Sequence, residues 1–313
     1  SFDHTIIIDD NTFPIVTVPS SYTIEGCDVS DITDLAYNET ETGITLAEYL
    51  SLPGAAASDN CNIASVTYMD NQNAGEPIDV VRRFRISDDC GNTRTRWQFI
   101  SIEDNTPPVV SGCPTDISQG TDAGNCNAVV SWTEPTANDN CDGALAFSSR
   151  SHAPDDVFPT GTTTVTYDFI DSQGNTSQCS FDVTITDDEA PVISGCPTNI
   201  SQGTDAGNCN AVVSWTEPTA TDNCDGGLPF TSRSHAPGDV FSTGTTTVTY
   251  TFTDAQGNSE ICSFDVTITD NEAPVISDCP SDISQGTDAG NCNAVVSWTE
   301  PTATDNCDGG LPF

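Results

Sequence analysis

Apolar and polar residues alternate along most of the chain, which is the pattern of half-buried β-strands. The alternation is clearest at 126–133 (CNAVVSWT), 163–169 (TTVTYDF) and 179–186 (CSFDVTIT). Pro, Gly, Asn and Asp gather between such segments and indicate turns. Only 44–50 (ITLAEYL) has a spacing that suits a short helix. With about seven short strands per module, the pattern predicts an all-β chain of immunoglobulin-like antiparallel sandwiches.

A repeat with a period of 83 residues organises most of the chain. The segment SQGTDAGNCNAVVSWTEPTA occurs three times without a change, at 118–137, 201–220 and 284–303. A Cys-Pro pair recurs with the same period, as Cys113-Pro114, Cys196-Pro197 and Cys279-Pro280. Such identity indicates recent duplication and predicts a tandem array of modules in a linear order.

Acidic residues followed closely by proline mark the joins between modules. They divide the chain into the end of a preceding module (1–10), a divergent module (11–105), two repeats (106–188 and 189–271) and a truncated repeat (272–313). The incomplete first and last segments predict a piece of a longer array. Because the joins are short, neighbouring modules are expected to touch.

The charge of the chain narrows the choice of partners. Asp and Glu number 47 against 7 basic residues, all arginine, which gives a net charge of −40. Such a surface repels nucleic acids and anionic membranes and attracts divalent cations. No apolar run reaches the roughly 18 residues of a membrane span. We therefore expect neither nucleic-acid binding nor membrane insertion.

Fourteen cysteines without a CxxC motif predict disulfides and an oxidising compartment. Zinc is the competing interpretation, but His4, His152 and His235 do not cluster with cysteines. If the first strand neighbours the last, topology favours the pairs Cys113–Cys179 and Cys196–Cys262. The pairs then expected from the remaining cysteines are Cys126–Cys141, Cys209–Cys224, Cys292–Cys307 and Cys61–Cys90. Cys27 is left over, and Cys279 would need a partner beyond Phe313.

Calcium is the one cofactor that the sequence suggests, in a structural role. One end of each sandwich should collect the acidic join, the DNCDG loop and the D-x-x-G-N turn, and calcium prefers such oxygen ligands. At the first join the candidates are Glu103, Asp104, Asn105, Asp139, Asn140, Asp142, Asp171 and Asn175. At the following joins they are Asp187, Asp188, Glu189, Asp222, Asn223, Asp225, Asp254, Asn258 and Asp270. The alternative is that these residues only form turns, which Asp and Asn favour without a metal.

No catalytic residues are proposed. Ser151-His152 and Ser234-His235 are adjacent in sequence, so their side chains point apart on an extended chain and form no triad. Trp132, Trp215 and Trp298 occupy equivalent strand positions. Core packing is their expected role, and a platform for sugar binding is the alternative.

Several motifs in a fixed order resemble the hyalin repeat (HYR) family over residues 106–313. They are CP, DNCDG, FPTGTTTVTY, D-x-x-GN and C-x-F-x-V-x-I-x-D followed by Pro. The first module, with RRFRISDDCGN and WQFISIED, is similar to a related immunoglobulin-like repeat. Mixed arrays of this kind resemble the giant repeat adhesins of gliding bacteria, which the type 9 system secretes. The resemblance implies an extracellular, cell-surface filament with a part in adhesion or surface motility.

Two functions follow as hypotheses, neither of them enzymatic. In the first, stiff modules contact the neighbouring repeats of the same chain and act as a spacer or stalk. In the second, the array binds a surface polysaccharide or a host surface, as a lectin does. A binding array should vary its loops between copies, yet DNCDG and SHAP persist. This sameness favours the spacer.

Overall fold

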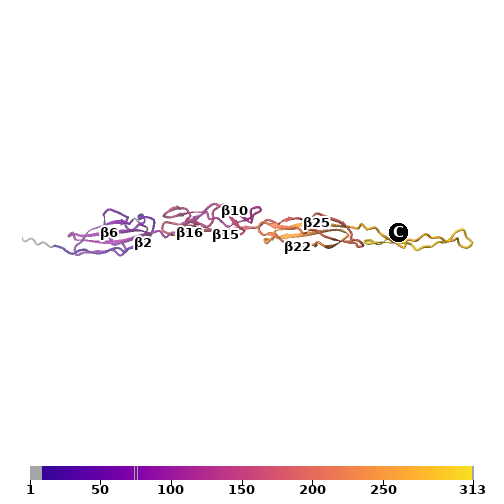
Figure 1. Cartoon of the computed structure of the whole chain (residues 1–313). Coiled ribbons are helices and arrows are strands. Elements are labelled where there is room, and N and C mark those ends of the chain that lie inside the picture. Colours follow the sequence, from indigo (N-terminus) through magenta and orange to yellow (C-terminus); the bar gives the residue numbers. More distant parts are fainter. Residues whose placement is uncertain (1–8, 74, 76, 312–313) are drawn as a thin grey trace, which may run out of the picture. The chain divides into compact units, whose positions relative to one another are not determined.

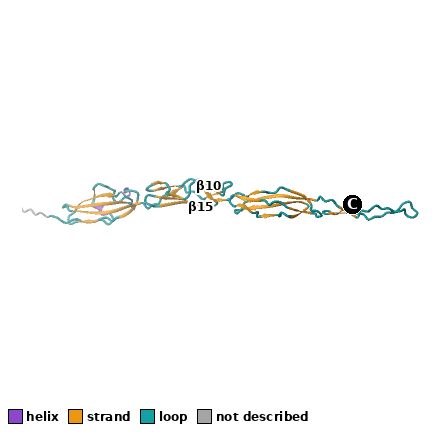
Figure 2. Ribbon diagram, in the orientation of Figure 1, coloured by secondary structure: helices purple, strands orange, loops and turns teal. Residues whose placement is uncertain are grey.

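The computed structural model describes residues 9–73, 75 and 77–311, most of which lie in strands and loops (Figures 1 and 2). The all-β prediction is confirmed, with several small sheets that follow one another along the chain. The chain divides into two compact units. The first holds the described residues up to Ile117, with Val130–Asp156 and Thr163–Val183. The second holds Ser118–Val129, Val157–Thr162 and the described residues from Thr184 onward.

The first module contains the short helix that the sequence suggested. Helix α1 (Leu46–Ser51) begins after Thr45, whose hydroxyl accepts the N–H of Glu48 (3.1 Å), while Glu48 Oε2 accepts the N–H of Thr45 (2.7 Å). The strands of this module are β1 (Ile15–Thr17), β2 (Tyr22–Glu25), β3 (Thr42–Ile44), β4 (Ala56–Ser58), β5 (Ile63–Gln72), β6 (Ile78–Asp88) and β7 (Thr93–Glu103), and η1 (Val29–Asp31) is a 3₁₀ turn. They form a sheet of order β2-β7-β6-β5-β3 and a β1-β4 pair.

The two repeats that follow share one strand plan. In the first repeat the strands are β8 (Val109–Ser111), β9 (Ile117–Gly120), β10 (Asn127–Val130), β11 (Thr136–Asp139), β12 (Gly143–Leu145), β13 (Ser149–Arg150), β14 (Asp156–Pro159), β15 (Gly161–Ile170) and β16 (Thr176–Thr186). In the second they are β17 (Val192–Ser194), β18 (Ile200–Gly203), β19 (Asn210–Val213), β20 (Thr219–Asp222), β21 (Gly226–Leu228), β22 (Ser232–Arg233), β23 (Asp239–Ser242), β24 (Gly244–Thr253) and β25 (Ser259–Thr269). The last segment adds β26 (Val275–Ser277), β27 (Thr302–Asp305) and β28 (Gly309–Leu311).

One part of the topology differs from the antiparallel sandwich expected from the sequence. Strand β18 pairs with β25 in parallel, with Ile200 opposite Val266, and the sheet order is β18-β25-β24-β22. Strand β2 pairs with β7 in the same way, with Tyr22 opposite Ile100. The chain enters a module at one end and leaves at the other, so its early and late strands run in the same direction and can pair only in parallel.

The core of the second repeat shows what the alternating pattern buries. Strand β24 contributes Val248, Tyr250 and Phe252, and β25 contributes Cys262, Phe264, Val266 and Ile268. Trp215 packs against this core with its ring edge-on to Phe264 (centroids 5.3 Å apart), and its Nε1 donates to the Tyr250 hydroxyl (2.8 Å). Trp215 is therefore a packing residue, as the sequence predicted, whereas the equivalent Trp298 in the last segment is 61% exposed.

Candidate functional site: the module junctions

Three acidic segments meet where one module joins the next. The first junction consists of residues 103–106 after β7, the β11–β12 turn at 139–142 and the β15–β16 turn at 171–175. All of these residues belong to the first unit. The second junction consists of residues 187–189, 222–225 and 254–258, all in the second unit.

Short-range hydrogen bonds fix the two turns of the first junction. Asp139 Oδ1 accepts the N–H groups of Cys141 (2.8 Å) and Asp142 (3.1 Å). Asp171 Oδ1 accepts the N–H of Asn175 (2.7 Å), whose side-chain amide donates to Asp171 Oδ2 (2.8 Å). Aspartate favours such turns because its carboxylate bonds the backbone a few residues on. The DNC and D-x-x-G-N motifs thus form turns that the carboxylates of Asp139 and Asp171 stabilise.

Two side-chain amides connect these turns to the segment that leaves the first module. Asn175 Nδ2 donates to the backbone carbonyl of Asp104 (2.8 Å), and Asn140 Nδ2 donates to Asp104 Oδ1 (3.3 Å). The side chains of Asp104, Asp139 and Asp171 are only 5%, 2% and 6% exposed. Acidic residues from two consecutive modules are therefore buried against one another.

The second junction repeats this arrangement with Asp187, Asp222 and Asp254. Asn258 Nδ2 donates to the backbone carbonyl of Asp187 (3.2 Å), and Asn223 Nδ2 approaches Asp187 Oδ1 (3.5 Å). The largest single effect on the pKa of Asp254 is burial, which by itself would raise it. The hydrogen bonds from the side chain and backbone of Asn258 and from the N–H groups of Gly257 and Gln256 together outweigh burial and hold that pKa below its usual value.

Two further copies of the cluster exist in the described part of the chain. One pairs Asp270 with Asp305, and the other gathers Asp10, Asp59 and Asp88. In the latter, Asn92 Nδ2 donates to the backbone carbonyl of Asp10 (3.1 Å), just as Asn175 does to Asp104. The same constellation thus recurs along the chain.

Other predicted ligands lie at the junctions but outside the aspartate clusters: Glu103, Asn105, Asp142, Asp188, Glu189 and Asp225. Protein hydrogen-bond donors occupy several of them. Asp142 Oδ2 accepts the N–H of Ser172 (2.6 Å), and Asp225 Oδ2 accepts that of Ala255 (2.7 Å). Glu189 accepts the N–H of Gly124 (2.9 Å).

Asn105, Glu103 and Asp188 also have other neighbours. Asn105 donates its N–H to Glu25 (2.9 Å), and Glu103 Oε1 accepts the hydroxyl of Ser101 (3.3 Å). Asp188 lies against Gly120, where an added Cβ would clash with its carboxylate. Asn105 and Asp188 thus contact residues of other segments, whereas the contact of Glu103 lies within β7.

The structure contains five disulfides, and two of them are the expected pairs within a repeat. Cys113 bonds Cys179, and Cys196 bonds Cys262. Cys113 lies between β8 and β9 and not within the first strand. Both pairings are confirmed, but the strand that lies beside the last one is the second of the repeat (β9 beside β16), because the first strand (β8) pairs with β11 in another sheet.

The other disulfides connect consecutive modules, so the predicted pairs Cys126–Cys141, Cys209–Cys224 and Cys292–Cys307 are wrong. The bonds are Cys27–Cys141, Cys126–Cys224 and Cys209–Cys307. Cys292 has no disulfide partner among the described residues. Cys27, which the sequence left over, is a junction cysteine.

The second repeat shows why the local pairing fails. The loop that carries Cys209 lies beside the segment leaving the module, where the N–H of Gly207 donates to Glu272 (3.0 Å). Cys224 lies at the entry to the module, within 4.8 Å of Asp187. The two loop cysteines of one module therefore contact different neighbours. The sequence signal for bonds between modules was the odd number of cysteines in the first module. If a loop cysteine of each module pairs with a cysteine of the next module, Cys27 also gains a partner.

The predicted Cys61–Cys90 bond is also absent, although the two Sγ atoms lie only 3.6 Å apart. Cys61 Sγ instead donates to Asp10 Oδ2 (3.0 Å). This hydrogen bond raises the pKa of the Cys61 thiol to about 12 and lowers that of Asp10 to about 2. A thiol that donates to a carboxylate is held in its protonated form.

The SHAP loops have a backbone role. Ser151 Oγ accepts the N–H of Thr166 (3.0 Å) and lies 3.1 Å from His152 Nδ1, so the expectation that these two side chains point apart is wrong. Ser234 and His235 repeat both contacts. The serine hydroxyl is thus part of the hydrogen bonding that seats the loop on the neighbouring strand.

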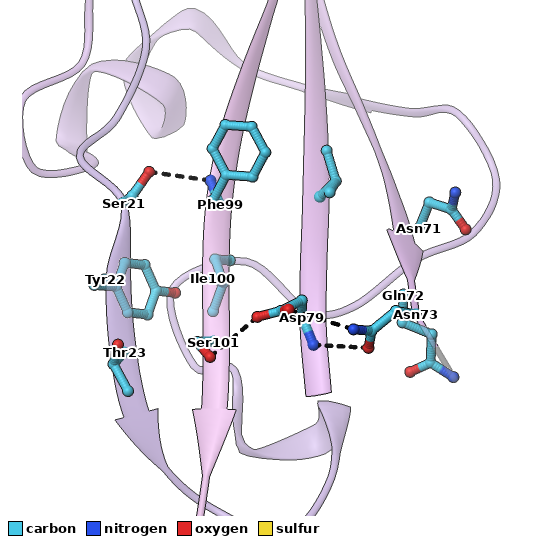
Figure 3. A pocket seen from close by; sticks show the side chains of 11 residues that line it. Ser21, Tyr22, Thr23, Asn71, Gln72, Asn73, Asp79, Phe99, Ile100 and Ser101 are labelled. Carbon is cyan, nitrogen blue, oxygen red and sulfur yellow. Dashed lines mark hydrogen bonds between the residues drawn. The ribbon is translucent and has the colours of Figure 1, made fainter. Parts of the chain in front are cut away.

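The first module has a groove of about 710 Å³ along strands β2, β6 and β7 (Figure 3). Phe99, which is 60% exposed, lies above Ile100 on its wall. Asp79 connects the two sides, accepting from the Ser101 hydroxyl (3.1 Å) and from Asn73 Nδ2 (3.3 Å). An exposed aromatic ring beside amide and carboxylate groups is the composition that a sugar ring can contact.

No helix among the described residues is long and apolar enough to cross a membrane.

Comparison with known proteins identifies the repeat. A family model described as the HYR domain matches residues 103–185, 186–268 and 269–311. Hyalin of Strongylocentrotus purpuratus is 36% identical over 97% of this chain, and hyalin of Lytechinus variegatus is 33% identical over 98%. The chain spans 25% and 56% of the lengths of these two relatives.

A third relative is named for other kinds of domain. The sushi, von Willebrand factor type A, EGF and pentraxin domain-containing protein 1 of Rattus norvegicus is 34% identical over 57% of this chain, which corresponds to 5% of its own length. All three relatives are animal proteins. The resemblance to adhesins of gliding bacteria therefore stays a prediction.

Proposed function

Because the chain belongs to the HYR-domain family, we propose that it is an extracellular, adhesion-type repeat segment whose modules form a stiff spacer. The observation that carries this proposal is the set of disulfides between consecutive modules, such as Cys126–Cys224. Disulfides of this number are typical of oxidising, extracellular compartments. The family and the all-β fold favour a structural role over an enzymatic one.

The covalent geometry of a junction supports the mechanical role. A single peptide link would let two modules swing about the join. The bond between Cys126 and Cys224 adds a second covalent connection at the same join, and two connections leave far fewer relative orientations. The hydrogen bond from Asn223 Nδ2 to the backbone carbonyl of Asn125 (2.9 Å) supports the same contact. Pulling on the chain would then load two covalent paths at once.

Small-angle X-ray scattering tests the spacer proposal. The oxidised chain should give an extended particle, with roughly 35–45 Å added per complete module, from strands of about 9 residues at 3.3 Å each plus the join. Replacing Cys126 and Cys224 with serine should lower the maximum dimension and broaden the distribution of distances. The same double change at Cys279 and Cys292, which have no disulfide in the described structure, is the matched control. Identical profiles for all three proteins would contradict the proposal.

A second candidate function, recognition of a surface polysaccharide, is favoured by the groove beside Phe99. Stacking on an aromatic ring contributes roughly 0.5–1.5 kcal/mol, so Phe99→Ala should weaken sugar binding by about two- to tenfold. Binding to a panel of extracellular polysaccharides measures this. Phe13→Ala removes a ring that is 50% exposed outside the groove and should leave binding unchanged. If no polysaccharide binds the unmodified chain, this second function is excluded for the panel tested.

A further inference from the structure

We propose that each junction binds a divalent cation of the calcium class between two aspartates, one from each of the joined modules. At the first junction these are Asp104 and Asp139, and at the second they are Asp187 and Asp222. The inference goes beyond the spacer proposal, because an ion can bind a junction whether or not the array acts as a spacer.

Two like charges are buried together at the first junction. One carboxylate oxygen of Asp104 and one of Asp139 lie within 4.8 Å of each other, and both side chains are more than nine-tenths buried. Two negative charges this close repel strongly where water is excluded. A cation between them converts the repulsion into attraction.

Apart from their charge, the two aspartates of the first junction also have unused hydrogen-bonding capacity. Asp104 Oδ2 and Asp139 Oδ2 are buried without a hydrogen-bond partner among the described residues. Their Oδ1 atoms are used by protein donors. Buried polar atoms in folded proteins nearly always have a partner. Two orphaned oxygens on neighbouring aspartates from two modules therefore indicate a missing ligand with positive charge.

The second junction repeats the observation in the other unit. Asp187 Oδ2 and Asp222 Oδ2 are buried and unpartnered there, and so is Asn223 Oδ1. An amide oxygen is a further ligand that calcium accepts. The local hydrogen bonds use only the Oδ1 atoms, so the Oδ2 atoms stay available to an ion at both junctions.

No side-chain cation of the described chain neutralises these aspartates. The ion pairs of its arginines are to Asp34, Asp70, Glu41, Glu134 and Glu217, none of which is at a junction. A bound ion would supply the charge that the protein does not.

The ligand atoms select the class of ion. Cys141 Sγ lies within 4.8 Å of the aspartate oxygens, but its bond to Cys27 removes the thiolate that zinc would need. The available donors are carboxylate and amide oxygens, which suit hard cations. Two or three protein oxygens leave the remaining positions to water, so the affinity should be modest, with a Kd of about 10⁻⁴–10⁻³ M.

Isothermal titration of Ca²⁺ into the oxidised full chain tests the proposal. The unmodified chain should bind with a Kd of about 10⁻⁴–10⁻³ M. Asp139→Asn keeps an oxygen for the N–H groups of Cys141 and Asp142 but replaces the orphaned oxygen with an amide nitrogen. It should remove one binding site, and Asp139→Asn with Asp222→Asn should remove two.

The matched control is Asp142→Asn with Asp225→Asn, which makes the same change of charge in the same loops. Those carboxylates accept N–H groups of Ser172 and Ala255 and should not alter the number of sites. The proposal is overturned if no heat of binding appears up to about ten times the expected Kd. It is also overturned if the control lowers binding as much as Asp139→Asn, because the ions would then only screen the surface charge.

Discussion

Replacing Cys196 and Cys262 with alanine should lower the free energy of unfolding of the second repeat by about 4 kcal/mol. The bond joins residues that are 66 apart in sequence, and closing a loop of this length restricts the unfolded chain by about that amount. The measured range for removing such bonds is about 2–5 kcal/mol. Cys262 is also buried in the core beside Phe264, so its loss removes packing as well.

Hydrogen exchange followed by mass spectrometry measures this effect locally. Peptides from β24 and β25 of the variant should exchange faster by about two to three orders of magnitude, since about 1.4 kcal/mol is a factor of ten. Cys279→Ala, at an exposed cysteine with no disulfide in the described structure, should change exchange very little. Equal protection of β24 and β25 in the unmodified protein and the double variant would show that the bond contributes nothing to stability.

The strands could be predicted from the sequence because the cause of each is local. In β24, the buried Val248, Tyr250 and Phe252 alternate with threonines that face outward, and this period of two is visible in the sequence itself. Helix α1 was visible for the same reason, because its capping box lies within four residues. The parallel pairing of β18 with β25 was not visible, because it depends on where the chain enters and leaves the module.

The disulfides within a module could be predicted from the sequence, and those between modules could not. The Cys196–Cys262 bond follows from which strands neighbour each other inside one module. The Cys126–Cys224 bond depends on a neighbouring module. Its separation of 98 residues exceeds the repeat length, so no comparison within a single repeat could reveal it. A sandwich presents different loops at its two ends, and an array puts each end against another copy.

The aspartates were located by sequence, but their individual roles were not. Motif spacing placed Asp104, Asp139 and Asp142 in the acidic loops at one end of the sandwich. It did not show that Ser172 uses the carboxylate of Asp142 while Asp139 keeps a buried oxygen without a partner. That distinction depends on differences of an ångström or two in the placement of backbone N–H groups, which residue types alone do not determine.

Arg82→Ala should destabilise the first module by about 3–5 kcal/mol, which is the usual cost of removing one partner from a buried ion pair. The Arg82 guanidinium is fully buried, with Nε 2.8 Å from Asp70 Oδ1 and Nη1 2.9 Å from Asp34 Oδ1. Its Nη2 also donates to the carbonyl of Leu35 (2.6 Å). Alanine would leave the carboxylate of Asp70, only 2% exposed, buried without its counter-charge.

Two comparisons separate this effect from a general loss of charge. Arg85 lies on the same strand as Arg82 and forms a half-exposed ion pair with Glu41 (3.8 Å). Arg85→Ala breaks this pair and should cost about 0–1 kcal/mol of stability. Arg82→Met with Asp70→Leu removes both charges and should cost less than Arg82→Ala alone, because no unpaired ion stays buried. Exchange of the β5, β6 and β7 amides measures all three variants. If Arg82→Ala and Arg85→Ala were equally stable, the buried network would be solvated in solution, and the first module would be held by its apolar core alone.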